Sequence, residues 1–530
     1  VRTAVFLFLV TFVWLQLHVA SLNGNRQAPG TDTSESNDST AAILSMVPQV
    51  LHKFLTPKPR NSSHAVVGTN VSEGAGAVGL IGPNAGRASS PNISDIRRNI
   101  ERYNDMQQVL NEELFGPVQN DSLIIVVQVH TRIIYLRHLI VSLAQARDID
   151  TVLLVFSHDY YDEEINELVQ SVDFCKVMQI FYPYSIQTHP KEFPGESPGD
   201  CPRNIKKEQA KEMLCNNALY PDLYGHYREA KFTQTKHHWW WKANRVFNQL
   251  EVTRNHTGMV LFLEEDHFVA EDFIHVLRLM ERTCHTSCNR CNILSLGTYL
   301  KTYNYYGDSK KVGGSQHKVF RYHKAVCFKI YLLCLSEVAA EHSELNGTRN
   351  WFSFFVCGSV WCETWLWSIP PSWSFQILPT LYQHYQKAEV TPWISSKHNM
   401  GMAFNRSTWL DVRHCAEFFC TYDDYNWDWS LQHISQGCLN HKLYAMVMKG
   451  PRVFHIGECG VHHKKANCES TAVISKVQQV LKYASKHLYP NYLTLTVTNT
   501  NKKQKLRKGN GGWGDVRDHQ LCINMTRSGR

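Results

Sequence analysis

The chain has 530 residues, of which 43% are hydrophobic and 19% are charged, and its formal net charge is +8. This length exceeds one minimal domain and is sufficient for a large core. The basic residues are spread along the chain, with a denser group only near Lys502 to Lys508, so we expect no nucleic-acid partner. Anionic small molecules and membrane surfaces stay open as partners.

The amino-terminal segment is almost wholly apolar over residues 4–20 and follows Arg2. Seventeen residues are at the short end of a membrane-spanning helix. A cleaved signal peptide is the alternative, and Val19-Ala20-Ser21 gives it some support. The chain begins with Val1 rather than Met, so we expect a cytoplasmic segment before it. We favour a signal anchor over residues 1–20, as in a single-pass type II membrane protein.

Residues 21–99 are rich in Ser, Asn, Gly, Pro and Ala, which is typical of a disordered stem. Many glycosylation sequons accompany the hydrophobic start, and sixteen cysteines agree with an oxidising lumenal compartment. The stem is therefore expected to be glycosylated and to lead into a lumenal domain at residues 100–530. The sequons begin at Asn37, Asn61, Asn70, Asn92, Asn120, Asn255, Asn346, Asn405 and Asn524.

In the lumenal part, apolar runs alternate with helical patterns, which predicts an α/β fold with a mainly parallel sheet. No Gly-rich phosphate loop of either standard type is present, so a bound diphosphate would have to be held by a cation. The pattern predicts strands at 123–129, 151–156, 177–182, 259–263 and 292–296, and helices at 135–146, 163–172 and 271–282.

The strand expected at 259–263 ends in Glu264, Glu265, Asp266 and His267. Buried carboxylates are costly unless they are paired or bound to a metal. Open α/β sheets bind their ligands at the carboxyl ends of their strands. We therefore expect a divalent cation that holds a diphosphate at this position. A solvated loop that is acidic by chance is the alternative.

Three further segments have side chains suited to a carbohydrate site. Residues 239–241 are three consecutive tryptophans, which we do not expect to face one core; they either lie partly exposed or line a cleft for sugars and bases. A hydrophobic anchor for the helix leading to Leu250 is the alternative. Residues 420–429 mix carboxylates with aromatic rings, as sugar sites do, although a folded surface loop is also open. His455 ends another apolar strand and becomes a candidate ligand because the acidic cluster needs one more; a structural histidine is the alternative.

Four segments, at residues 235–241, 262–267, 421–429 and 511–519, resemble the N-acetylglucosaminyltransferase II family of Golgi glycosyltransferases. The resemblance runs from about residue 123 to 522, with one large interruption. It implies a disulfide-bonded GT-A fold, which is Rossmann-like, and a Golgi membrane location with a lumenal catalytic domain. It also implies inverting, Mn²⁺-dependent transfer of GlcNAc from UDP-GlcNAc to the α-1,6-arm mannose of N-glycans. The product would be a β-1,2 linkage formed in hybrid-to-complex N-glycan maturation, and a homodimer stays open.

The resemblance assigns roles to single residues. Asp266 and His455 would bind Mn²⁺, with Glu264 and Glu265 as the rest of the acidic motif, and Asp428 would be the catalytic base. Tyr303 departs from the family, which has an Arg there, so that contact is in doubt. The implied substrate-binding residues are Gln128, Val129, His130, Thr131, Arg132, Asp159, Gln234, Thr235, Lys236, His237, His238 and Asn399.

The largest departure from the family is the stretch at about residues 312–387. A structureless insertion of that length in a compact domain is unusual. We favour a translated intron or a gene-model error, and a genuine insert that could obstruct the acceptor side is the alternative. The stretch contains Cys327, Cys334, Cys357 and Cys362. The resemblance pairs Cys201 with Cys215, Cys288 with Cys291, Cys415 with Cys438, Cys420 with Cys522 and Cys459 with Cys468, and leaves Cys175 and Cys284.

Two other functions stay open besides this transferase. One is an inactive lumenal lectin-like protein that keeps the sugar cleft, and the other is a related GT-A transferase with another acceptor. The lectin hypothesis predicts loss of the base or of a metal ligand. Asp266, His455 and Asp428 are all present, which favours an enzyme.

Overall fold

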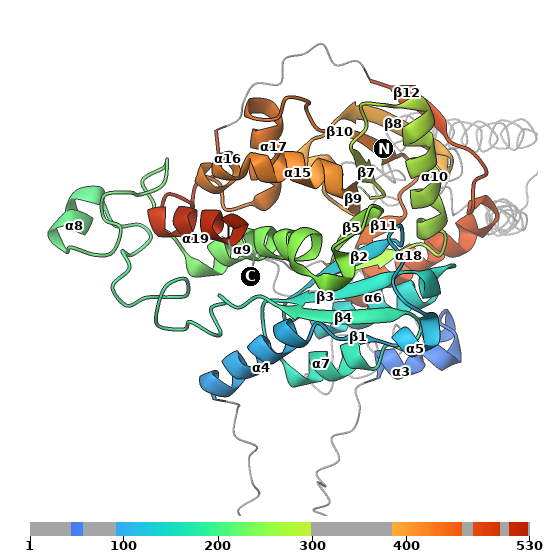
Figure 1. The fold of residues 1–530 in the computed structure, drawn as a ribbon, viewed down its shortest axis with the longest axis horizontal. Coiled ribbons are helices and arrows are strands. Elements are labelled where there is room, and N and C mark those ends of the chain that lie inside the picture. Colours follow the sequence, from blue (N-terminus) through green and yellow to red (C-terminus); the bar gives the residue numbers. More distant parts are fainter. Residues whose placement is uncertain (1–43, 57–91, 298–383, 458–469, 499–507, 528–530) are drawn as a thin grey trace, which may run out of the picture. The chain divides into compact units, whose positions relative to one another are not determined.

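A computed structural model describes residues 44–56, 92–297, 384–457, 470–498 and 508–527 (Figure 1). The chain divides into two units, residues 1–49 and 50–530, and everything below concerns the second. No helix within the described ranges is long and apolar enough to cross a membrane. The expected anchor at 1–20, Tyr303 and nearly all of the stretch at 312–387 lie outside the described residues.

A ten-stranded mixed sheet forms the centre of this unit, in the order β1-β4-β3-β2-β5-β9-β7-β10-β8-β12. Its strands β2, β3, β4 and β5 are parallel, and the predicted α/β fold is confirmed. A separate two-stranded ribbon pairs β6 (His267–Val269) with β11 (Val453–His455). The sheet strands are β1 (Val109–Leu110), β2 (Ile124–Val129), β3 (Leu153–His158), β4 (Lys176–Phe181), β5 (Met259–Glu264), β7 (Ile293–Ser295), β8 (Lys387–Pro392), β9 (Met402–Asn405), β10 (Tyr444–Met448) and β12 (Thr494–Val497).

Helices flank the sheet, and the three that the sequence predicted are α6, α7 and α10, with ends shifted by a few residues. Apolar periodicity marks a buried face but not the caps, which explains the shifted ends. The helices of eight residues or more are α4 (Ile93–Met106), α6 (Ile133–Ala144), α7 (Glu163–Gln170), α9 (Ala230–Asn244), α10 (Phe273–Ser287), α15 (Arg406–His414), α17 (Trp427–Gly437), α18 (Ser470–Ala484) and α19 (Val516–Arg527). Shorter ones include α3 (His52–Leu55), α5 (Glu112–Phe115), α8 (Lys207–Glu212), α14 (Ser395–His398) and α16 (Ala416–Thr421).

Helix α9 corrects the expectation about the three tryptophans. Trp239, Trp240 and Trp241 are only 1%, 0% and 8% exposed and belong to one core. The expectation that they could not share a core was wrong because α9 is covered on several sides; it packs against α17 and α19, and its tryptophans share a core with residues of the sheet strands (Figure 1). Trp239 stacks on Trp427 at 4.5 Å between ring centroids, and Trp240 stacks on Phe419 at 4.2 Å. The three tryptophans are therefore a hydrophobic anchor for this helix, which was the alternative interpretation.

Two helices within the range expected to be stem pack against the folded unit. Phe54 of α3 is fully buried, and its carbonyl accepts a hydrogen bond from Arg137 of α6 at 3.0 Å. Helix α4 buries Ile96 and Ile100, which are one turn apart, against Phe181 at the end of β4. Ordered contacts with the sheet unit therefore begin before residue 100.

Candidate active site

The carboxyl ends of β2, β3 and β5 lie side by side and carry the acidic cluster. Gln128 of β2 is in register with Ser157 of β3 and with Glu264 of β5. Directly after β5, Glu265 and Asp266 are 1% and 2% exposed. This burial rules out the solvated acidic loop, and it places the carboxylates at the edge of the sheet where open α/β folds bind ligands.

Arg132, four residues after Gln128, pairs with both buried carboxylates. Its Nε lies 2.7 Å from an oxygen of Glu265, and its terminal nitrogen lies 2.7 Å from Oδ2 of Asp266. The backbone N–H of His130 donates to the other oxygen of Glu265 at 2.7 Å. Burial opposes ionisation of Asp266, but hydrogen bonding to His455 and the charges of His455 and Arg132 outweigh it and hold its pKa well below the ordinary value.

The β6–β11 ribbon brings His455 to this cluster. His455 is in register with His267, and its Nε2 lies 3.1 Å from Oδ2 of Asp266. Both Arg132 and His455 use Oδ2, whereas Oδ1 of Asp266 is buried and has no hydrogen-bond partner among the described residues. An unpartnered buried carboxylate oxygen beside an imidazole is suited to a divalent cation. The residues present therefore fit a metal ion.

His267 is a metal-ligand candidate that sequence reasoning did not assign. A ligand atom from each of Glu264, Asp266 and His267 lies within 4.8 Å of the others. His267 is buried, which lowers its pKa to about 3 and keeps the imidazole neutral, as a metal ligand must be. Its Nδ1 already accepts a hydrogen bond from the backbone N–H of Glu264 at 3.1 Å. The position of His267 directly after the three acidic residues was the sequence signal for this role.

Asp159, just after β3, joins two histidines of the expected substrate set. One carboxylate oxygen lies 2.6 Å from Nδ1 of His130, and the other lies 3.3 Å from Nδ1 of His238. His238 is fully buried and also contacts the Ser157 hydroxyl at 2.8 Å, whereas His130 is exposed on its other side. Thr131 is exposed next to it, and Val129 is fully buried in β2. The structure thus gathers these residues at one strand edge.

One face of α9 also points to the strand ends. Gln234, His238 and Lys242 are spaced by four residues, so they share a face. Gln234 accepts a hydrogen bond from the backbone N–H of Ile186 at 2.7 Å, and the Lys242 amine lies 2.6 Å from the side-chain oxygen of Gln128. Sequence reasoning did not assign Lys242, although this spacing was a signal for it.

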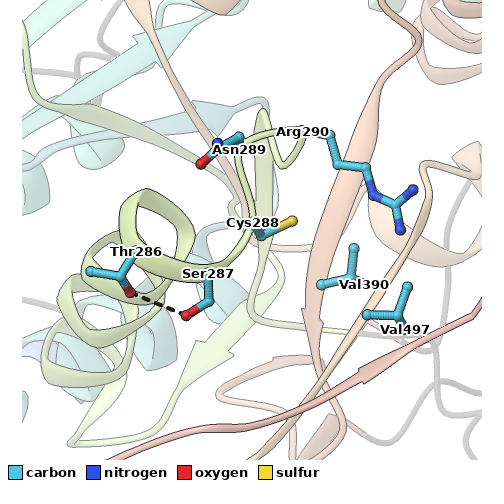
Figure 2. Close-up of a pocket in the computed structure, with 7 residues that line it drawn as sticks. All are labelled: Thr286, Ser287, Cys288, Asn289, Arg290, Val390 and Val497. Carbon is cyan, nitrogen blue, oxygen red and sulfur yellow. Dashed lines mark hydrogen bonds between the residues drawn. The ribbon is translucent and has the colours of Figure 1, made fainter.

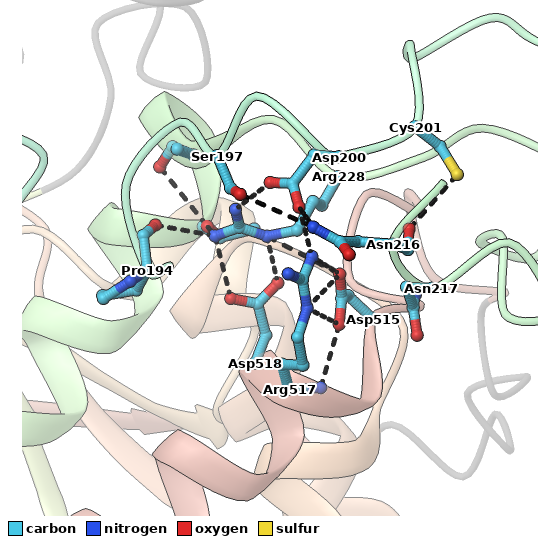
Figure 3. A network of polar contacts seen from close by, with 12 residues as sticks. Pro194, Ser197, Asp200, Cys201, Asn216, Asn217, Arg228, Asp515, Arg517 and Asp518 are labelled. Atoms are coloured by element: carbon cyan, nitrogen blue, oxygen red, sulfur yellow. Dashed lines mark hydrogen bonds and ion pairs between the residues drawn. The ribbon is translucent and has the colours of Figure 1, made fainter. Parts of the chain in front are cut away.

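Lys236 and His237 face elsewhere, and both are buried. The Lys236 amine donates to the carbonyls of Tyr422 and Asp424 at 3.1 and 3.0 Å. His237 lies 3.0 Å from Asp518 of α19, which Arg228 also binds (Figure 3). Their protein partners are thus in the carboxyl-terminal part of the chain. Thr235, just before Lys236, is half-buried.

Asp428 lies in the first turn of α17, close to the acidic edge. Strand β9 runs antiparallel to β5 with Met402 opposite Phe262, which places Asn399 beside the end of β5. The Asn399 amide donates to Oδ2 of Asp428 at 3.0 Å, and the Trp429 N–H donates to Oδ1 at 3.0 Å. Burial, together with the charges of Asp424 and Glu264, raises the pKa of Asp428 to about 7. Such a carboxyl group can exchange a proton near neutral pH.

Four of the five expected disulfides are present, and the fifth, Cys459–Cys468, lies outside the described residues. The Cys420–Cys522 bond joins α16 to α19. Cys175 and Cys284 are free, as expected. The four bonds are Cys201–Cys215, Cys288–Cys291, Cys415–Cys438 and Cys420–Cys522.

A shallow hollow of about 440 Å³ lies beside the Cys288–Cys291 disulfide (Figure 2). None of the residues expected to bind donor, acceptor or metal lines it, so it is separate from the candidate active site. Its lining consists of Thr286, Ser287, Cys288, Asn289, Arg290, Val390 and Val497.

Comparisons with known proteins identify the family of the chain. Residues 97–330 and 376–522 match the model of the family described as N-acetylglucosaminyltransferase II (MGAT2). The unmatched residues 331–375 fall inside the stretch expected to depart from the family, and the match extends into both ends of that stretch.

Several relatives share the name alpha-1,6-mannosyl-glycoprotein 2-beta-N-acetylglucosaminyltransferase. The Rattus norvegicus protein is 38% identical over 81% of this chain and 79% of its own length. The Homo sapiens protein is 37% identical over 81% of this chain and 78% of its own length. The Arabidopsis thaliana protein is 28% identical over 78% of this chain and 77% of its own length. With most of its length matched by the family model and by these relatives, the chain belongs to the N-acetylglucosaminyltransferase II family.

Proposed function

We propose that the chain transfers GlcNAc from UDP-GlcNAc to the 2-hydroxyl of the α-1,6-arm mannose of N-glycans, with inversion to a β-1,2 linkage. This reaction belongs to the conversion of hybrid to complex N-glycans. Family membership and the names of the relatives support the donor sugar and the acceptor arm. The observation that carries the proposal is Asp428, a carboxyl group with a near-neutral pKa, held by Asn399 beside the acidic edge of the sheet.

In this proposal Asp428 accepts the proton of the mannose hydroxyl as its oxygen attacks the anomeric carbon. Attack from the face opposite the diphosphate inverts that carbon. The side-chain N–H of Asn399 orients Asp428. The side-chain oxygen of Asn399, Oδ1, is buried without a hydrogen-bond partner in the described part of the chain. That oxygen can accept a hydrogen bond from a substrate hydroxyl. Arg132 supplies positive charge beside the strand ends, where the diphosphate would lie, and Lys242, whose pKa burial lowers to about 7, can donate a hydrogen bond there.

Asp266 and His455 would hold Mn²⁺, with Glu264 and His267 close by. The unpartnered Oδ1 of Asp266 supports this assignment. When bound, the ion would neutralise negative charge on the departing UDP. We place the domain in the Golgi lumen, anchored through residues 1–20, which the sequons and the disulfides support.

The test uses the purified full chain with UDP-GlcNAc and defined N-glycans that do or do not bear GlcNAc on the other arm. We expect transfer to the α-1,6-arm mannose that requires Mn²⁺ and stops when the ion is chelated. Asp428→Asn should lower kcat by about 10² to 10⁴ while leaving UDP binding intact. Asp411→Asn, at an exposed position of α15, is the matched control and should have no effect.

Two outcomes would count against the proposal. Glycan binding without any transfer would favour the inactive lectin, and transfer to a different sugar would favour a related transferase. Unchanged turnover in Asp428→Asn would remove this residue from the base role.

Transcript sequencing through residues 312–387 decides between a gene-model error and a genuine insert, since unbroken reads would exclude the error.

A further inference from the structure

Two glycosylation sequons, at Asn120 and Asn255, come together at one place in the fold. Asn120 lies in the turn before β2 and Asn255 in the turn before β5, and both side chains are exposed. Neither side-chain amide has a hydrogen-bond partner within the described ranges, so each Nδ2 is available for modification. The side chain of Asn405, a third sequon at this edge, is instead held as the N-cap of α15, where its oxygen accepts two hydrogen bonds from Thr408.

The two turns are fixed to one another. The backbone N–H of Thr257, the third residue of one sequon, donates to the carbonyl of Asn120 at 2.8 Å. Buried His256 contacts the carbonyl of Ser122, the third residue of the other sequon, at 2.7 Å. The folded structure therefore holds the two acceptor asparagines side by side, although they are far apart in the sequence.

The direction of the strands separates this pair from the candidate active site. β2 and β5 are parallel and each has six residues, so their amino and carboxyl ends are about 17 Å apart at ~3.3 Å per residue. The sequons precede the strands, whereas Gln128 and Glu264 lie at their carboxyl ends. Sugars attached at the two asparagines would thus extend from the end of the sheet opposite the acidic cluster.

We infer that Asn120 and Asn255 both carry N-linked glycans, which form a paired glycan surface at the end of the sheet opposite the active site. This inference rests on the proposed lumenal location. The donor would be a lipid-diphosphate-linked oligosaccharide of the lumen. Asparagine Nδ2 forms a bond to its anomeric carbon and gives up one proton to the oligosaccharide-transferring enzyme. The bond from that carbon to the diphosphate breaks, and its electron pair leaves with the lipid diphosphate. An enzyme whose acceptors are N-glycans thereby keeps its own glycans out of its acceptor site.

The test is the site-by-site mass of glycopeptides from the full chain expressed in a eukaryotic secretory pathway. We expect sugar at both positions and the loss of one glycan in each of Asn120→Gln and Asn255→Gln. Thr257→Ala should also remove the Asn255 glycan, and Thr257→Ser, which keeps the sequon, should retain it. The kcat and KM for a free N-glycan acceptor should stay within about twofold in all of these variants.

The Asn92 sequon distinguishes the ways in which the inference can fail. A chain that carries sugar at Asn92 but lacks it at Asn120 or Asn255 overturns the paired surface and leaves the proposed function standing. A chain without sugar at any sequon overturns the lumenal location as well. If activity changes equally in Asn255→Gln and Thr257→Ala, the placement of that glycan away from the acceptor site is wrong.

Discussion

Asp424 lies four residues before the proposed base, and its carboxylate is completely buried. It accepts hydrogen bonds from the backbone and side-chain N–H groups of both Asn426 and Asn510, at 2.8 to 2.9 Å. Lys236 binds its carbonyl oxygen. This arrangement fixes the start of α17 and keeps a negative charge close to Asp428. The pKa of Asp428 thus depends on Asp424, although none of the described hydrogen bonds joins the two carboxylates.

Removing that charge should change the pH dependence of the reaction. Asp428 must be ionised to accept a proton, so kcat/KM should rise with pH through about 7. Asp424→Asn removes a repulsive charge, and the midpoint of that rise should move to lower pH. The measurement is the pH profile of kcat/KM, with Asp411→Asn as the control. A profile that falls in height without a shift in midpoint would show that Asp424 acts only on the fold.

The raised pKa of Asp428 also has a consequence for stability. Its folded pKa, about 7, exceeds the ordinary value of 3.8, so the folded protein loses stability as pH rises between these values. Asp428→Asn removes the ionisable group and should stabilise the fold at pH 8 by about 4 kcal/mol, with little gain at pH 4. Urea unfolding at the two pH values measures this difference. An equal gain in stability at both pH values would mean that packing, not ionisation of Asp428, causes the difference.

At the scale of elements, helix α9 connects the core to the site. Its tryptophans pack in the core, while its Gln234–His238–Lys242 face reaches the strand ends. Trp240→Ala should lower the free energy of unfolding by about 3 to 5 kcal/mol because it leaves a large cavity. Phe418→Ala is the control, since Phe418 is 47% exposed and should cost much less. Denaturant unfolding compares the two variants; similar losses would mean that α9 is not a core helix.

The elements that the sequence predicted well are those with local signals. The strands β2 to β5 are mainly apolar runs, and the acidic run begins at the last residue of β5. The buried tryptophans were misjudged because all-round burial of α9 depends on α17 and α19, which come much later in the chain. The pairing of His267 with His455 across the ribbon has no local signal either; His455 was a candidate because the acidic cluster needed a further ligand, and the family resemblance then related it to Asp266.

At the scale of the whole molecule, a buried ionic network ties distant segments together (Figure 3). Arg228 binds Asp518 of α19 at 2.9 Å and Asp200 at 3.3 Å, and Arg517 binds Asp200 at 2.7 Å. The charges and hydrogen bonds of Arg228 and His237 overcome burial and lower the pKa of Asp518 to about 2. The network therefore connects the segment before α9 with the carboxyl-terminal helix.

Breaking this network should destabilise the protein in a pH-dependent way. Because the folded pKa of Asp518 is depressed, its contribution is present above about pH 4 and is lost as pH falls towards 2. Asp518→Asn leaves Arg228 with an unbalanced buried charge. It should lower the free energy of unfolding, measured by urea denaturation, by about 3 to 5 kcal/mol at pH 7. Asp95→Asn, in an exposed ion pair with Arg98, is the control. A loss at pH 7 that matches the control would contradict the structural role of the network.

The β6–β11 ribbon gives a way to observe ligand binding separately from turnover. Its two strands come from opposite sides of residues 331–375, the part outside the family match, and an ion held by Asp266 and His455 would connect them. Any local opening that separates the strands would have to release the ion first. Amide hydrogens of Phe268 and Phe454 should therefore exchange with solvent deuterium about 100-fold more slowly when UDP and Mn²⁺ are present at 100 times their Kd. Protection in the inactive Asp428→Asn protein would show an intact donor site even where no sugar is transferred.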